Sequence, residues 1–214
     1  MTTKDTSKLI INAISQAFHT LGDTLIGLGE YRCAITVYLQ AIELNPTDAV
    51  AYSDLAHVLN LSDQWSGDNT GRSPLEYLDY SIRLDPSSPS AYAHRAESRR
   101  LDAHHYADVI ARTVSRPTDN IEIGSLVFAA LRDINQVYAI VKAKGDEATP
   151  DDFKAVVIAV YNARRLIGAR GEDATGPLDD QAVRQATLQH PLVQKGIQAG
   201  KLTPDYVLKG FRTL

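Results

Sequence analysis

The residues best suited to chemistry are the histidines, of which the sequence has six. His104 and His105 are adjacent, so on a helix their side chains point in different directions. His104 shares a helical face with Asp108, but no cysteine lies near them and no His-Glu-x-x-His spacing occurs. We interpret the pair as solvated side chains and predict no metal site.

Sequence motifs of catalysis are also missing. The chain has no Gly-x-Ser-x-Gly elbow, no Walker loop and no Gly-x-Gly-x-x-Gly turn. Cys33 falls among the packing positions of a predicted helix, so we expect a buried structural thiol rather than a nucleophile. We therefore predict a protein that is not an enzyme and uses no cofactor.

Composition and charge further restrict the kinds of protein that this sequence can encode. The 214 residues are 44% apolar and 22% charged, which is ordinary for a globular protein. The formal charge of −4 disfavours nucleic-acid binding, which needs a basic face. Two arginine clusters are interpreted as solvated helix faces: Arg95, Arg99 and Arg100, and Arg164, Arg165 and Arg170. One cysteine, no signal-peptide pattern and no long apolar run lead us to expect a cytoplasmic protein without a membrane partner.

A repeated pattern gives the strongest signal in the sequence. Residues 41–46 read AIELNP and residues 81–86 read SIRLDP, and each proline is followed by polar residues and a new helix start, AVAY at 49–52 and SAY at 90–92. Proline disfavours a helix in the residue before it and suits the first turn of a new helix after it. The pattern predicts paired helices that end and restart at the same point of each unit.

The unit before Pro46 is the most complete. Its first helix is marked by apolar and small residues at helical spacing, Phe18, Leu21, Gly22 and Leu25; a turn at 29–31 comes next, then a second helix marked by Ala34, Tyr38 and Ala41. Small residues allow two helices to approach closely, and the aromatic rings fill the gaps. From Ser15 to Asp48 the chain resembles a tetratricopeptide repeat (TPR).

Two further units depart from that pattern. The second, from Ala49 to Pro86, contains an insertion at 62–73, after which Ser73 and Pro74 predict a helix start. The insertion holds the single tryptophan, Trp65, which is either an exposed anchor for a partner or part of a local core. The third unit begins at Ser90 and is degenerate; its predicted second helix carries Tyr106, Val109, Ile110 and Val114.

The second half predicts long helices without a repeat signature. A capping box at 119–122 opens a helix over 120–144, Gly145 ends it, and Thr149 with Pro150 opens the next, so residues 119–168 form a hairpin. Short helices come next, near 179–189, 191–199 and 204–210, and they dock either on this hairpin or on another subunit. We expect an all-α protein with a TPR-like region at 6–116 and a C-terminal helical region at 119–214 that packs on the repeats.

The resemblance implies a location for binding. In TPR proteins the first helix of each repeat lines a concave groove, and the matching residues are Gln16, His19, Asp23, Ser53, Asp54, His57, His94, Glu97 and Arg100. Carboxylates and imidazoles on one surface suit a basic or polar peptide, although any solvated helix face carries polar residues. Because unperturbed histidine titrates near pH ~6.5, binding in such a groove is expected to weaken between about pH 7.5 and 5.5.

Three functions are compatible with these observations. The first is a scaffold or adaptor that binds a protein or peptide partner through the groove. The second is a self-assembling helical protein that forms a homodimer through its C-terminal helices. The third is an enzyme whose site has no recognisable motif.

Overall fold

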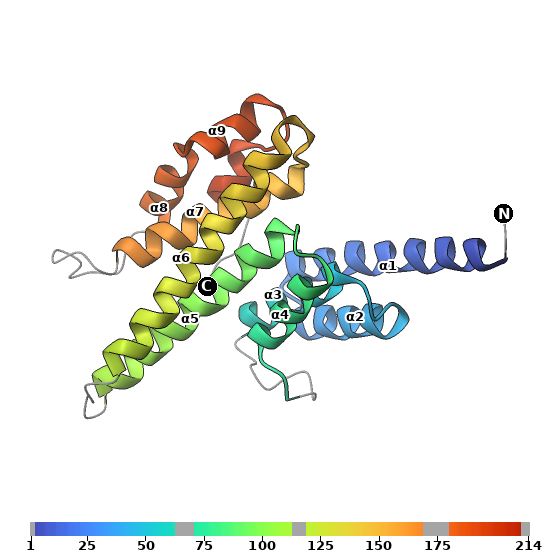
Figure 1. The fold of residues 1–214 in the computed structure, drawn as a ribbon, viewed down its shortest axis with the longest axis horizontal. Helices are drawn as coiled ribbons and strands as arrows, with labels where there is room; N and C mark the ends of the chain where they lie inside the picture. The colour runs from blue at the N-terminus through green and yellow to red at the C-terminus, as the bar shows by residue number, and fades with distance from the viewer. Residues whose placement is uncertain (1–2, 63–70, 113–118, 169–179, 211–214) are drawn as a thin grey trace. The chain divides into compact units, whose positions relative to one another are not determined.

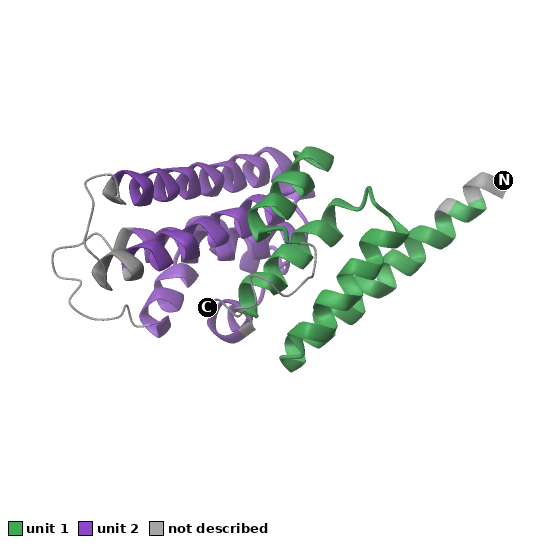
Figure 2. Cartoon of the chain, turned by 90° about the horizontal axis from the view of Figure 1, so that it is seen from below, with its two compact units in different colours: residues 1–86, 214 green, residues 87–213 purple. Residues whose placement is uncertain are grey.

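The computed structural model describes residues 3–62, 71–112, 119–168 and 180–210, and the regular elements in these ranges are all helices (Figure 1). The predicted all-α class is therefore confirmed. The chain divides into two compact units, Met1–Pro86 and Ser87–Thr213 (Figure 2). No helix in the described ranges is both long enough and apolar enough to cross a membrane.

Unit 1 (Met1–Pro86) consists of two consecutive helix pairs. Helices α1 (Thr3–Leu28) and α2 (Tyr31–Leu44) form the first pair, and α3 (Ala49–Leu61) and α4 (Pro74–Leu84) form the second. Each helix packs on the next along the chain. Helix α1 begins twelve residues before the predicted repeat at Ser15, because no glycine or proline interrupts the sequence between 3 and 21.

Local capping residues set the helix starts in unit 1. The Asp48 side chain accepts hydrogen bonds from the backbone N–H groups of Val50 (3.1 Å) and Ala51 (3.2 Å) at the start of α3. At the start of α4, Ser73 and Glu76 form a reciprocal capping box, with Pro74 as the first helical residue. The helix start predicted at Ser73 and Pro74 is confirmed.

Small residues bring the helices of the first pair together. A Cβ atom built on Gly22 would lie 2.4 Å from Cζ of Tyr38, so no side chain fits at this position without moving that ring. Ala34 and Ala41 are completely buried on α2. The close contacts predicted for these three residues are therefore present, whereas Phe18 is only half-buried.

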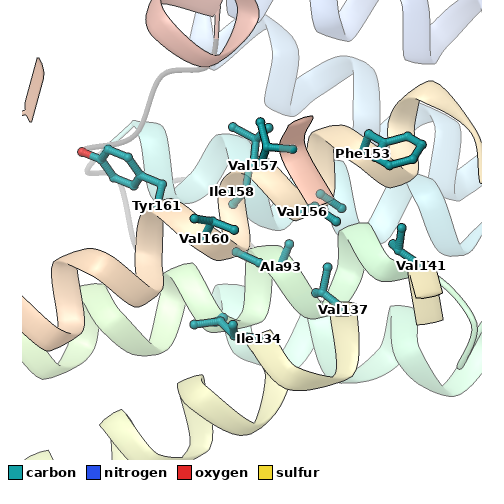
Figure 3. Close-up of a cluster of buried hydrophobic side chains, with 14 of the residues drawn as sticks. Ala93, Ile134, Val137, Val141, Phe153, Val156, Val157, Ile158, Val160 and Tyr161 are labelled. Carbon is teal, nitrogen blue, oxygen red and sulfur yellow. The ribbon is translucent and has the colours of Figure 1, made fainter. Parts of the chain in front are cut away.

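Unit 2 (Ser87–Thr213) surrounds one buried helix. Its elements are α5 (Pro89–Arg112), α6 (Asp119–Lys144), the 3-10 turn η1 (Gly145–Glu147), α7 (Pro150–Gly168), α8 (Asp180–Leu188), α9 (Pro191–Gln198) and the π-turn η2 (Tyr206–Gly210). Helix α7 contacts α5, α6, α8 and α9, and every residue from Ala155 to Asn162 is at most 8% exposed. Figure 3 shows Ala93 of α5, Val137 of α6 and Val156 of α7 within this core. A helix that is buried on all sides in this way is the centre of its domain.

The predicted hairpin at 119–168 is present as α6, η1 and α7. Thr149 caps α7 through a reciprocal pair: its hydroxyl accepts from the N–H of Asp152 (3.2 Å), and its own N–H donates to the Asp152 carboxylate (2.7 Å). The C-terminal helices pack on α7 within the same chain, and Val183, Val193 and Val207 are buried there. Of the two predicted arrangements, the structure shows docking on the hairpin of the same chain.

The prediction of a degenerate third repeat, with two helices, was wrong. Residues 89–112 form one continuous helix, α5, so Tyr106, Val109 and Ile110 continue this helix instead of starting a second one, and Val114 lies outside the described residues. Helix α5 packs against α6 and α7. The compact units accordingly divide after Pro86, whereas the sequence predicted a boundary between residues 116 and 119.

Arginines explain why α5 belongs to unit 2. Arg95 donates to both carboxylate oxygens of Asp133 on α6 (3.0 and 2.8 Å), and Arg99 contacts the same carboxylate, which is almost completely buried. Arg100 is itself buried and donates to Asn162 of α7 (2.7 Å). The interpretation of these arginines as a solvated face was wrong, because their side chains are largely buried against these partners. The partners lie 34 to 62 residues further along the chain, so local sequence does not reveal them.

Candidate protein-binding surface

The candidate surface lies on the first helices of the two repeats in unit 1, α1 and α3. On α1, Gln16 and Asp23 are exposed, two turns apart on one face. The Tyr38 ring packs over Gly22, and its hydroxyl donates to Asp23 Oδ1 at 2.9 Å, which fixes this carboxylate on the surface. Burial and the neighbouring carboxylates Asp54 and Asp23 raise the pKa of Tyr38, so it remains a neutral phenol that donates this hydrogen bond.

His19 connects the first repeat to the second. Its Nδ1–H donates to Asp54 Oδ2 at 2.9 Å, and its Nε2–H donates to Asp48 Oδ2 at 3.1 Å. Asp48 also accepts from the Ser15 hydroxyl while it caps α3. We call these four residues, Ser15, His19, Asp48 and Asp54, the inter-repeat cluster.

The inter-repeat cluster keeps His19 positively charged. Burial alone would lower the pKa of His19, but hydrogen bonds to Asp48 and Asp54 and their negative charges outweigh it and raise the pKa to about 10. For Asp48, burial is likewise outweighed, by hydrogen bonds from His19 and Ser15 and by the imidazolium charge, which lower its pKa to about 2. Burial raises the pKa of Asp54. At a pKa of about 10, His19 keeps its charge between pH 7.5 and 5.5, so this residue does not support the predicted weakening of binding in that range.

The second-repeat residues are less accessible than the sequence predicted. Ser53 is only 2% exposed, while Asp54 and His57 are half-buried. Asp54 is engaged by His19 within the inter-repeat cluster. On the two repeats of unit 1, the exposed members of the predicted groove set are therefore Gln16 and Asp23.

The three residues predicted from the third unit do not lie on an exposed face. His94 is 7% exposed, Glu97 1% and Arg100 6%, and all three belong to α5 in unit 2. Burial lowers the pKa of Arg100, and Glu97 opposes this effect with its charge. These side chains are not displayed to a partner in this structure, because α5 uses this face for packing inside unit 2.

Other residues singled out from the sequence have mixed outcomes. Cys33, the third residue of α2, is exposed, so the expectation of a buried thiol was wrong. His104 and His105 are both exposed on α5. Trp65 lies outside the described residues.

The inter-repeat cluster was not predicted from the sequence. Asp48 directly before the start of α3 is a typical N-cap residue, and this was the one local signal of the cluster in the sequence.

Comparison with known proteins supports the repeat. A family model described as a TPR repeat matches residues 22–60, which run from the second half of α1 through α3. No match was found among curated proteins, and none among solved structures. Residues 22–60 are therefore similar to a tetratricopeptide repeat, which confirms the family resemblance that the sequence indicated; the match covers most of the predicted first unit at 15–48 and the first helix of the second.

Proposed function

We propose that this chain is a protein-interaction scaffold or adaptor that binds a peptide or protein partner through its repeat region. The observation that carries the proposal is the TPR match at residues 22–60, because repeats of this kind are generally protein-binding modules. The helix pairs of unit 1 have the arrangement that such a module needs.

The surface formed by α1 and α3 favours a basic or polar partner. Asp23 is exposed and held in place by Tyr38, and Gln16, two turns earlier on the same face, adds an amide that can both donate and accept hydrogen bonds. Asp54 is half-buried nearby in the inter-repeat cluster, where the cationic His19 offsets part of the negative charge. Asp23 is therefore the strongest attraction that this surface offers to a lysine or arginine side chain.

The test is peptide selection followed by affinity measurement. Selection from a random peptide library on the full chain should enrich lysine, arginine and uncharged polar residues. The best peptide is then labelled, and its affinity is measured by fluorescence anisotropy for the parent, Asp23→Asn and Gln16→Lys. Asparagine keeps an oxygen that can accept from Tyr38, so the substitution changes the charge and not the fold.

Glu43→Gln is the matched control, because Glu43 is an exposed carboxylate on α2 of the same unit. We expect each α1 substitution to weaken binding by roughly threefold to fivefold, since exposed charge pairs contribute on the order of 0–1 kcal/mol each and the upper end of that range is about fivefold. The control should change affinity by less than twofold. Enrichment of acidic peptides, or equal affinity for the parent and both α1 variants, would contradict this location for the site.

A further inference from the structure

Helix α1 presents an apolar stripe to solvent on the side opposite His19, the residue that contacts α3. Its members follow a strict 4-3-4-3-4 spacing: Ile10, Ile14, Ala17, Leu21, Thr24 and Leu28. The four large side chains are 54%, 41%, 47% and 71% exposed in that order. Several large apolar side chains in one continuous line are unusual on a protein surface, whereas isolated ones are normal.

The stripe is also free of charge and of unsatisfied donors. From Leu9 to Leu28 the only charged residue besides the inward-facing His19 is Asp23, which Tyr38 engages. The hydroxyl of Thr24 donates to the Thr20 carbonyl at 2.7 Å, and that of Thr20 donates to the Gln16 carbonyl at 3.1 Å. These threonines can thus be covered by another surface without losing a hydrogen bond, which removes the usual cost of burying them.

The spacing identifies the type of surface that fits. Apolar residues that alternate at intervals of four and three form the seam of a coiled coil, in which another helix runs alongside and its side chains insert between them. We propose that the partner on this stripe is α1 of a second copy of the chain, and that the two helices run antiparallel. The proposal is independent of the peptide-binding surface on α1 and α3.

Side-chain size favours this occupant and this direction. In an antiparallel pair centred near residue 19, Ala17 faces Leu21 and Thr24 faces Ile14, so a small side chain lies opposite a large one in four of the six layers. The outer layers pair Ile10 with Leu28. A parallel pair would instead place Ala17 against Ala17 and Thr24 against Thr24, which leaves gaps beside the large layers. The stripe is therefore complementary to itself, as a two-fold symmetric interface requires.

The length of the stripe sets the expected strength. Eighteen residues separate Ile10 from Leu28, which is roughly 27 Å of helix. A single pair of helices over this length is at the small end of specific interfaces, and such interfaces are usually weak. We expect a dimer with a Kd on the order of micromolar rather than an obligate dimer.

Sedimentation velocity of the full chain over about 1–200 µM tests the proposal. The parent should shift from monomer to dimer, and Leu21→Glu, which places two charges in the central layers, should weaken the dimer at least tenfold. Val50→Glu is the control: Val50 is 52% exposed at the start of α3, off the stripe, where an acidic residue suits the helix N-terminus. A parent that stays monomeric at 200 µM, or a dimer that Leu21→Glu does not weaken, would overturn the proposal. The second result would direct attention to the C-terminal helices.

Disulfide trapping tests the direction. In a Cys33→Ser background, a mixture of Ile10→Cys and Leu28→Cys chains should form a mixed disulfide dimer under mild oxidation, because these positions face each other only in the antiparallel pair. Leu28→Cys alone should form little dimer, since its two copies would be roughly 27 Å apart. Efficient self-linking of Leu28→Cys without the mixed product would show a parallel pair and contradict the antiparallel arrangement.

Discussion

His19 gives the sharpest stability prediction, because both of its ring nitrogens are committed to carboxylates. The substitution is His19→Gln, which keeps a hydrogen-bond donor and a similar size but cannot carry a positive charge. It leaves Asp48 and Asp54 close together without the cation between them. The loss should appear as a lower free energy of unfolding, and it should depend on pH in a defined window.

The magnitude is set by the pKa of His19 in the folded chain. A rise of the His19 pKa from 6.5 to about 10 would correspond to about 5 kcal/mol of folding free energy if the cluster were fully shielded from water. The side chains of His19, Asp48 and Asp54 are 12%, 13% and 21% exposed, so solvent screens part of the attraction. We therefore expect His19→Gln to cost about 2–3 kcal/mol at pH 6.

The sign of the pH dependence is set by the direction of the change. A group whose pKa is raised by folding contributes its full stabilisation below its unfolded pKa, near 6.5, and loses it as the pH rises through about 10. The difference between the parent and His19→Gln should therefore be constant below pH 6.5 and shrink steadily towards pH 10. A histidine with an unperturbed pKa would instead lose its charge within roughly one pH unit on either side of 6.5.

Urea unfolding followed by circular dichroism at pH 6, 8 and 10.5 measures this difference. His104→Gln is the control, since His104 is exposed on α5, and it should match the parent at each pH. NMR titration of the imidazole resonance missing in His19→Gln gives the pKa directly. A difference in unfolding free energy that is the same at pH 6 and 10.5, or a His19 pKa near 6.5, would refute the reasoning.

Three further predictions concern packing and buried charge, and each is checked by thermal or urea unfolding. Gly22→Ala should destabilise the chain by about 1–3 kcal/mol through overpacking, whereas Gly27→Ala on the same helix, where a Cβ meets nothing within 4 Å, should be neutral or stabilising by up to about 1 kcal/mol. Ala41→Leu should cost about 1–3 kcal/mol because Ala41 is fully buried, and unchanged melting would show that the repeat packs differently. Asp133→Asn should cost about 3–5 kcal/mol because it removes the shared partner of two arginines, while Asp151→Asn, an exposed change of the same kind, should stay within about 0.5 kcal/mol.

Local sequence determined the helices and their starts. Four helices, α4, α5, α7 and α9, begin with proline as their first residue, and the caps at Ser73 and Thr149 use partners three residues away. The same holds for the small residues that define the repeat, because Gly22 and Tyr38 belong to adjacent helices joined by a short turn. Such features depend on spacings of a few residues or on one tight connection, so the order of the amino acids is enough to predict them.

Tertiary structure alone decided which polar side chains are displayed and which are buried. Glu97 and Arg100 occupy positions that the repeat pattern assigns to an open groove, but α5 turns this face into unit 2. Arg95 finds its carboxylate 38 residues away, and His19 finds Asp54 35 residues away. Pairings over such distances depend on how whole helices pack, and a buried charge is tolerated only where packing supplies its partner. For the same reason, the sequence alone contains the 4-3 spacing of apolar residues on α1, whereas the exposure of these side chains to solvent depends on how the helices pack.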